Sequence, residues 1–105
     1  MSFNDYLATF PAVDHLSGLN VLNEAGEVVH HIPAVAGKLG SLKLYNALAE
    51  RFEGLLNAEA ATQGLTWFAE HVADAEANSG KHPNVDLLLA VQAEQKQYHL
   101  QAIAQ

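Results

Sequence analysis

Apolar positions in the first third of the chain predict a short helix followed by a β-hairpin. The helix is predicted over residues 3–10, where apolar side chains recur at helical spacing: Phe3, Tyr6, Leu7 and Phe10. Pro11 ends this pattern, because proline disfavours helical geometry in the residue before it. Two β-rich runs, Leu19–Asn23 and Glu27–Ile32, then flank a turn that contains Gly26, and Pro33 closes the second run. We therefore expect an antiparallel hairpin.

Two amphipathic patterns in the middle of the chain predict helices. After a loop over residues 34–40, Ser41 is expected to cap a helix that begins at Leu42. Its apolar stripe is Leu42, Tyr45, Leu48, Ala49 and Phe52. A longer helix is predicted from its N-cap, Asn57, to the stop signal over residues 78–80, with the stripe Ala61, Leu65, Phe68, Val72 and Ala75. Glycine costs about 1 kcal/mol relative to alanine inside a helix, so we expect any bend or break at Gly64.

The last quarter of the chain is ambiguous until its flanking residues are considered. Residues 84–91 satisfy both a period of two and a period near four, so a helix and a strand remain alternatives. We favour the helix because leucine and alanine are good helix formers, and because Pro83, Asn84 and Asp86 resemble a helix start. The alternative is a strand that pairs with the C-terminal run, Gln97–Ala104, whose alternating pattern itself predicts a strand.

These elements together predict an α+β fold that forms a single domain over residues 1–105. The hairpin and the C-terminal strand would form a small antiparallel sheet, with the helices packed on one face. A hydrophobic content of 50% and a charged content of 16% suit such a core. A three-stranded sheet has two edges, so Leu19–Asn23 or Gln97–Ala104 could extend it across the axis of a homodimer or toward a protein partner.

The charge balance restricts the partners. Twelve carboxylates against five Lys and Arg give a net charge of −7, which repels phosphate backbones, so we expect no nucleic-acid partner. Residues 53–80 carry acidic side chains and no Lys or Arg: Glu53, Glu59, Glu70, Asp74 and Glu76. We expect this segment to give one face a negative potential that would draw a basic partner or a cation.

The chain lacks cysteine, which excludes disulfides and thiolate metal sites. The first residues lack the basic and apolar segments of a signal peptide, and no apolar run approaches the ~20 residues needed to cross a bilayer. We therefore expect a cytoplasmic protein with no membrane contact. We also expect no bound cofactor.

Histidines and carboxylates in residues 67–86 form the most distinctive candidate site. On one helical wheel, Trp67, His71 and Asp74 fall on a single ridge at the edge of the core. His71 and Asp74 are three positions apart, so the carboxylate could orient the imidazole or both could face one cation. A tight turn would add His82 or Asp86 as a third ligand. The predicted ligand-binding residues are Trp67, His71, Asp74, Lys81, His82 and Asp86, with His71, Asp74 and His82 as candidate metal ligands.

Simpler interpretations compete with this site. The spacing lacks the His-Glu-x-x-His pattern of zinc hydrolases, so Asp74 could merely pair with His71 on the helix surface. Adjacent residues on a strand face opposite sides, so His30 and His31 cannot together chelate one ion.

Two glycine-lysine segments suggest an anion site. Gly80, Lys81 and the free N–H groups at the helix start could hold a carboxylate or phosphate. A P-loop would instead require glycine at Ala75 and Ser or Thr at His82, so we favour a helix stop followed by a solvated lysine. We interpret residues 37–40, Gly-Lys-Leu-Gly, as a strand-to-helix connection.

Several short runs, taken in order, resemble a family of small conserved bacterial proteins catalogued only as a domain of unknown function. They are Gly40-Ser41-Leu42 with Tyr45, Gly64-Leu65, Phe68-Ala69-Glu70-His71, Asp74-Ala75 and Gly80-Lys81-His82-Pro83-Asn84-Val85-Asp86. The resemblance covers nearly the whole chain. It implies a bacterial cytoplasmic protein that stands alone as one domain, and it implies no activity and no catalytic residue.

Three functional hypotheses follow from the sequence. The first is a non-enzymatic binding or interaction module that self-associates or docks a protein through a sheet edge or an acidic helix. The second is a protein that binds a divalent metal or small ligand through His71, Asp74, His82 and Asp86. The third is a small acid/base enzyme that uses His71 with Asp74 in a pocket edged by Trp67.

Overall fold

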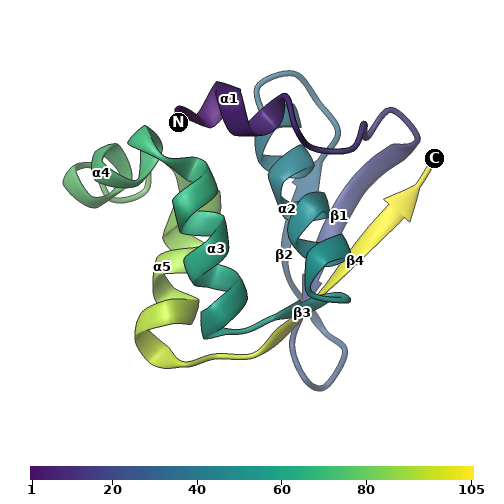
Figure 1. The fold of residues 1–105 in the computed structure, drawn as a ribbon. Helices are drawn as coiled ribbons and strands as arrows, with labels where there is room; N and C mark the ends of the chain where they lie inside the picture. The colour runs from purple at the N-terminus through teal and green to yellow at the C-terminus, as the bar shows by residue number, and fades with distance from the viewer.

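The computed structural model describes residues 1–105 as five helices and a four-stranded sheet (Figure 1). The helices are α1 (Phe3–Leu7), α2 (Leu39–Arg51), α3 (Ala58–Phe68), α4 (Glu70–Ala77) and α5 (Pro83–Glu94). The strands are β1 (Leu16–Leu22), β2 (Val28–Pro33), β3 (Leu55–Leu56) and β4 (Tyr98–Ala104). The predicted α+β class, the hairpin, the helix after His82 and the C-terminal strand are confirmed.

The sheet has the order β2-β1-β4-β3, and every neighbouring pair is antiparallel. The hairpin turn is held by Asn23, whose Oδ1 accepts the backbone N–H groups of Ala25 and Glu27. Strand β1 lies between β2 and β4, so the expectation that Leu19–Asn23 forms an edge is wrong. The three-stranded prediction also missed β3, because two residues are too short to show a period.

Helix α2 packs on the inner face of the sheet and encloses most of the core. Leu19, Val21 and Ile32 of the sheet belong to one buried cluster with Leu44 and Leu48 of α2. The helix begins three residues earlier than predicted, at Leu39, so Ser41 is not its N-cap. The physical reason is a turn at Gly37, whose positive φ of 87° directs the chain into the helix at Lys38.

Helices α3 and α5 lie side by side, and Gly64 makes their close approach possible (Figure 1). A Cβ at position 64 would lie 2.6 Å from Leu88 Cδ1 and 2.9 Å from Leu48 Cδ1, both inside van der Waals contact. The helix continues through this glycine without a break. Gly64 is therefore a packing residue, and the expected bend there is wrong.

The predicted helix over residues 57–78 breaks at Ala69. Ala69 has φ 53° and ψ −117°, and its N–H caps α3 by donating to the carbonyls of Leu65 and Thr66. Helix α4 then leaves in a new direction at one end of the molecule (Figure 1). This break allows the end of α3 and the start of α4 to pack on one ring. Phe3 stacks on Phe68 at 5.4 Å and meets the edge of His71 at 4.8 Å.

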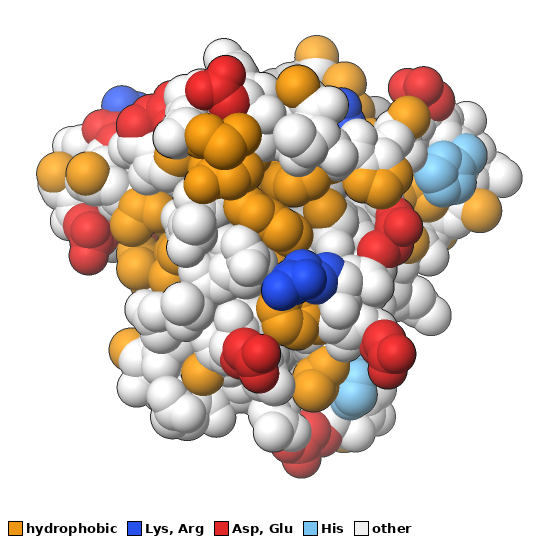
Figure 2. All heavy atoms as spheres, viewed as in Figure 1, with side chains coloured by type: hydrophobic (Ala, Val, Ile, Leu, Met, Phe, Trp, Pro, Cys, Tyr) orange, Lys and Arg blue, Asp and Glu red, His pale blue; other side chains and the backbone are white.

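Acidic side chains are dispersed over the helical face of the molecule, with apolar atoms exposed between them (Figure 2). The helices themselves are too short or too polar for any of them to traverse a lipid bilayer.

Candidate functional site

A cavity of about 440 Å³ lies between α1, the first turn of α2, the end of α3 and the start of α5. Phe3, Leu7 and Phe68 supply an apolar wall. The rest of the lining comes mainly from two loop-to-helix junctions, residues 37–41 and 81–85, which are distant in the sequence. The fold thus joins the two glycine-lysine segments of the sequence at one hollow.

Three of the six predicted site residues line this cavity: His71, Lys81 and His82. The other three, Trp67, Asp74 and Asp86, do not. Trp67 packs on Phe10 with ring centroids 4.7 Å apart. The helical wheel placed Trp67 with His71 and Asp74 on one ridge, but that construction assumes one continuous helix axis. The break at Ala69 puts Trp67 on α3 and the other two residues on α4.

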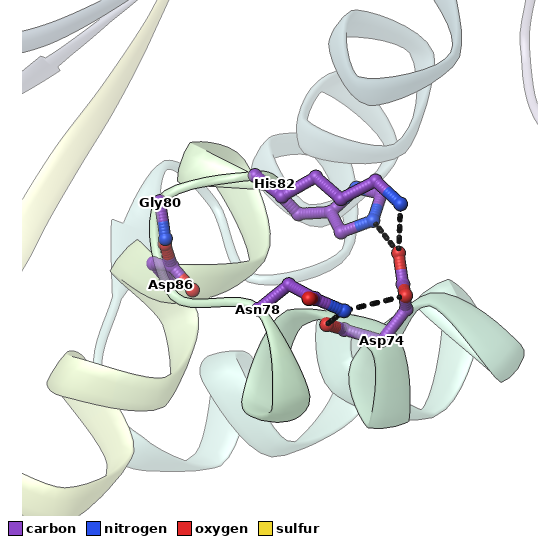
Figure 3. A network of polar contacts seen from close by, with 6 residues as sticks. Asp74, Asn78, Gly80, His82 and Asp86 are labelled. Atoms are coloured by element: carbon purple, nitrogen blue, oxygen red, sulfur yellow. Dashed lines mark hydrogen bonds and ion pairs between the residues drawn. The ribbon is translucent and has the colours of Figure 1, made fainter.

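Asp74 is the centre of a polar network that holds the turn between α4 and α5 (Figure 3). Its Oδ2 accepts from His82 Nε2 at 2.5 Å and from Lys81 Nζ at 3.2 Å, while Asn78 Nδ2 donates to Oδ1 at 3.1 Å. The hydrogen bonds from His82 and Lys81 hold the pKa of the Asp74 carboxyl below its usual value. The simpler expectation that Asp74 pairs with His71 is therefore wrong, since its partner is His82.

Asp86 closes the same turn from the other side. Its Oδ2 accepts the backbone N–H of Gly80 at 3.0 Å. Figure 3 labels both residues. Gly80 has a positive φ of 90°, which suits the sharp reversal between the two helices. Asp86 therefore stabilises the turn: its carboxylate bonds Gly80, and its backbone N–H donates to the carbonyl of His82 at 2.9 Å, so it does not join the two imidazoles as a ligand.

The histidines of the site do not assemble into a metal centre. The rings of His71 and His82 lie 5.4 Å apart, and His71 rests against Phe3. No three His, Asp or Glu side chains of the chain are placed to hold a metal ion together. The geometry thus does not support the prediction that His71, Asp74 and His82 bind a metal ion together.

Asn84 and the α2 junction are site residues that the sequence interpretation missed. Asn84 is only 6% exposed, and its Oδ1 lies 2.6 Å from His30 Nε2 of β2. Its backbone carbonyl accepts from the Tyr45 hydroxyl at 2.6 Å. Burial raises the pKa of Tyr45, which keeps this hydroxyl a donor. No local pattern could link His30 to Asn84, because the contact depends on the packing of α5 against the sheet.

The profile of a bacterial family matches residues 3–102 of the chain, which is nearly all of it. The chain belongs to the DUF2322 family. The family is described as an uncharacterised protein conserved in bacteria, so the resemblance predicted from the sequence is confirmed. The match includes all the residues of this DUF2322 protein that line the cavity. Neither the curated proteins nor the solved structures yield a match to it.

Proposed function

We propose that this DUF2322 protein binds a small molecule in the cavity between α1, α2 and α5. The observation that carries the proposal is the cavity itself, with its volume of about 440 Å³. Sites for small ligands are commonly concave hollows of about 300–1,000 Å³, with an apolar lining and a few polar groups. The cavity combines these features, since Phe3 and Phe68 face the same space as Ser41 and His82.

Hydrogen bonds within the protein already hold the polar residues of the cavity in place. Asp74 fixes the imidazole of His82 through Nε2, and His30 and Tyr45 fix Asn84 from the opposite side. Side chains held in this way lose little conformational entropy when a ligand binds. This preorganisation supports a binding role for the most recognisable run of the sequence, Gly80–Asp86.

Binding can be tested by following the backbone amide signals of the ¹⁵N-labelled protein during titration with a panel of anionic, neutral and cationic aromatic fragments. We expect at least one fragment to shift, saturably, the amides of residues 37–41 together with those of His82, Asn84 and Val85. Asn4→Trp should abolish this response, because Asn4 is exposed at the cavity and a large ring there would fill it. Ala8→Trp is the matched control, since Ala8 is exposed outside the cavity. A panel with no effect on these amides would refute the proposal.

Self-association through β2 is a second candidate function. Strand β2 forms one edge of the sheet, and its side chains Val28 and Val29 are 55% and 47% exposed. An exposed apolar edge can pair with a second copy and continue the sheet. We expect a dimer whose mass falls to that of the monomer in Val29→Lys. A monomeric mass for the unaltered protein at high concentration in analytical ultracentrifugation would exclude this candidate.

A further inference from the structure

We infer that the ligand of the cavity is a small organic anion, a phosphate or carboxylate group attached to an apolar body. This inference rests on the proposed function and names the chemistry of its ligand. Its first support is the distribution of charge around the cavity. The chain has only five Lys and Arg, yet two of them, Lys38 and Lys81, line this hollow. None of the twelve Asp and Glu lines it.

Asp74, the carboxylate that pairs with Lys81 and His82, leaves Lys81 able to bind an anion in the cavity. Asp74 contacts Lys81 Nζ and His82 Nε2 but does not line the cavity. An ammonium group has three N–H donors, so Lys81 can remain paired with Asp74 and still donate to an anion in the hollow. Asp74 thereby anchors Lys81 and His82 at the rim, and the ammonium group of Lys81 keeps N–H donors for the ligand.

Backbone donors at the same rim are unpaired within the protein. The N–H groups of Leu39, Gly40 and Ser41 donate no hydrogen bond, and all three residues line the cavity. Lys38, the N-cap of α2, supplies no side-chain cap. In contrast, Asn57 caps α3 through its side chain. Free N–H groups at the start of a helix favour an anion, and here the residues that carry them line the same cavity as the two lysines.

Asn84 provides an independent indication that a ligand accepts hydrogen bonds here. Its side chain is more than nine-tenths buried, and only Oδ1 is used, by His30. The Nδ2 group donates to no protein atom, and no fully enclosed polar atom of the protein lacks a partner. Nδ2 is therefore not fully enclosed by protein, and Asn84 is one of the residues that line the cavity. An amide donor without a partner, held rigidly at a cavity wall, matches an acceptor on a ligand.

The apolar wall defines the rest of the ligand. Phe3, Leu7 and Phe68 present rings and a branched chain to the same cavity as the donors, so an anion with a planar or aliphatic body would fill the volume better than a bare ion. Phenyl phosphate and phenylacetate are suitable probes for the two anionic groups. Benzyl alcohol and benzylamine are neutral and cationic counterparts of similar size.

The experiment titrates each of these four probes, and inorganic phosphate, into the ¹⁵N-labelled full chain. We expect phenyl phosphate or phenylacetate to shift the amides of Leu39, Gly40 and Ser41 saturably, and to bind at least tenfold more tightly than benzyl alcohol or benzylamine. The tighter of the two anions identifies the headgroup. Inorganic phosphate should bind more weakly than phenyl phosphate, and equal affinity would overturn the claim of an apolar body.

Charge-removing variants complete the test. Lys38→Gln and Lys81→Gln should each weaken binding of the preferred anion about tenfold, as expected for loss of one charged hydrogen bond. Lys96→Gln is the matched control, because Lys96 also pairs with a carboxylate, Glu94 at 3.6 Å, but lies outside this cavity. If benzyl alcohol binds as tightly as the anions, or both variants bind unchanged, the anion inference fails while the proposed function stands. If no probe or fragment perturbs the cavity amides, both fail.

Discussion

The contact between α3 and α5 and the junction between α3 and α4 use small residues in opposite ways. Gly64 lies in a regular helix and is small so that Leu48 and Leu88 can approach its backbone. Ala69 carries a side chain although its φ of 53° lies in the left-handed region, where glycine is the favoured residue. A glycine in a sequence can therefore indicate close packing, and a sharp turn can occur without one.

The two regions also differ in what holds them. The α3–α5 contact is apolar at Gly64, where Leu88 of the main buried cluster packs, and a hydrogen bond from Gln92 to Thr62 lies at its exposed edge. Helix α4 buries only Ala75 and is held largely by the polar network of Asp74 and Asp86. The polar network thus fixes Lys81 and His82 at the cavity, whereas buried leucine side chains secure the contact between α3 and α5.

The largest expected effect is at the close approach between α3 and α5. Gly64→Val should lower the free energy of unfolding by about 2 kcal/mol, because the added methyl groups would overlap with buried leucine side chains. Urea denaturation followed by circular dichroism measures this change. Thr66→Val is the control, since it places the same side chain on the exposed face of α3 and should change stability by less than about 0.5 kcal/mol. Equal effects at both positions would show that Gly64 has no packing role.

A smaller effect of opposite sign is expected at the junction. Ala69→Gly should raise the free energy of unfolding by about 1 kcal/mol, because glycine adopts this backbone conformation without strain. The same denaturation experiment measures it. Ala73→Gly, in the regular part of α4, should instead be destabilising by about 1 kcal/mol. A loss of stability at both alanines would contradict the strained junction.

The smallest expected effect is on the titration of Asp74. Its pKa is lowered by the hydrogen bonds from His82 and Lys81, so the stability that this pairing adds is present above the ordinary aspartate pKa of about 3.9 and is lost as the pH falls through the lower folded value. Carboxyl ¹³C signals recorded against pH should place the Asp74 midpoint below that ordinary value. The midpoint should rise in Lys81→Gln and stay unchanged in Lys96→Gln. An unaltered midpoint in Lys81→Gln would show that Lys81 does not help to lower the pKa of Asp74.

Much of the fold could be predicted because its signals are local. The hairpin turn at Gly26 and the helix start at Pro83 are set by residues within a few positions of each other, and both are confirmed. Ala69 could not be identified in this way, because no turn residue marks it and the break depends on packing around Phe3.

The candidate site was predicted only in part for the same reason. The residues around Lys81 and His82 stood out as an unusual run, and both line the cavity. Their partners come from elsewhere: the α2 junction approaches from more than thirty positions away. Each glycine-lysine segment alone resembled an ordinary connection. Their convergence depends on how α2 and α5 are placed by the sheet, which no spacing within either segment encodes.

Through its hydrogen bond to Asn84, His30 of the hairpin helps to hold a residue that lines the cavity, although 54 positions separate the two residues. A replacement at position 30 that removes this bond would leave Asn84 free to rotate, and a compensating replacement at position 84 could restore the fit. Among DUF2322 sequences, these two positions are thus expected to vary together, so that evolutionary covariation would connect a strand on the sheet edge to a pocket formed by helices.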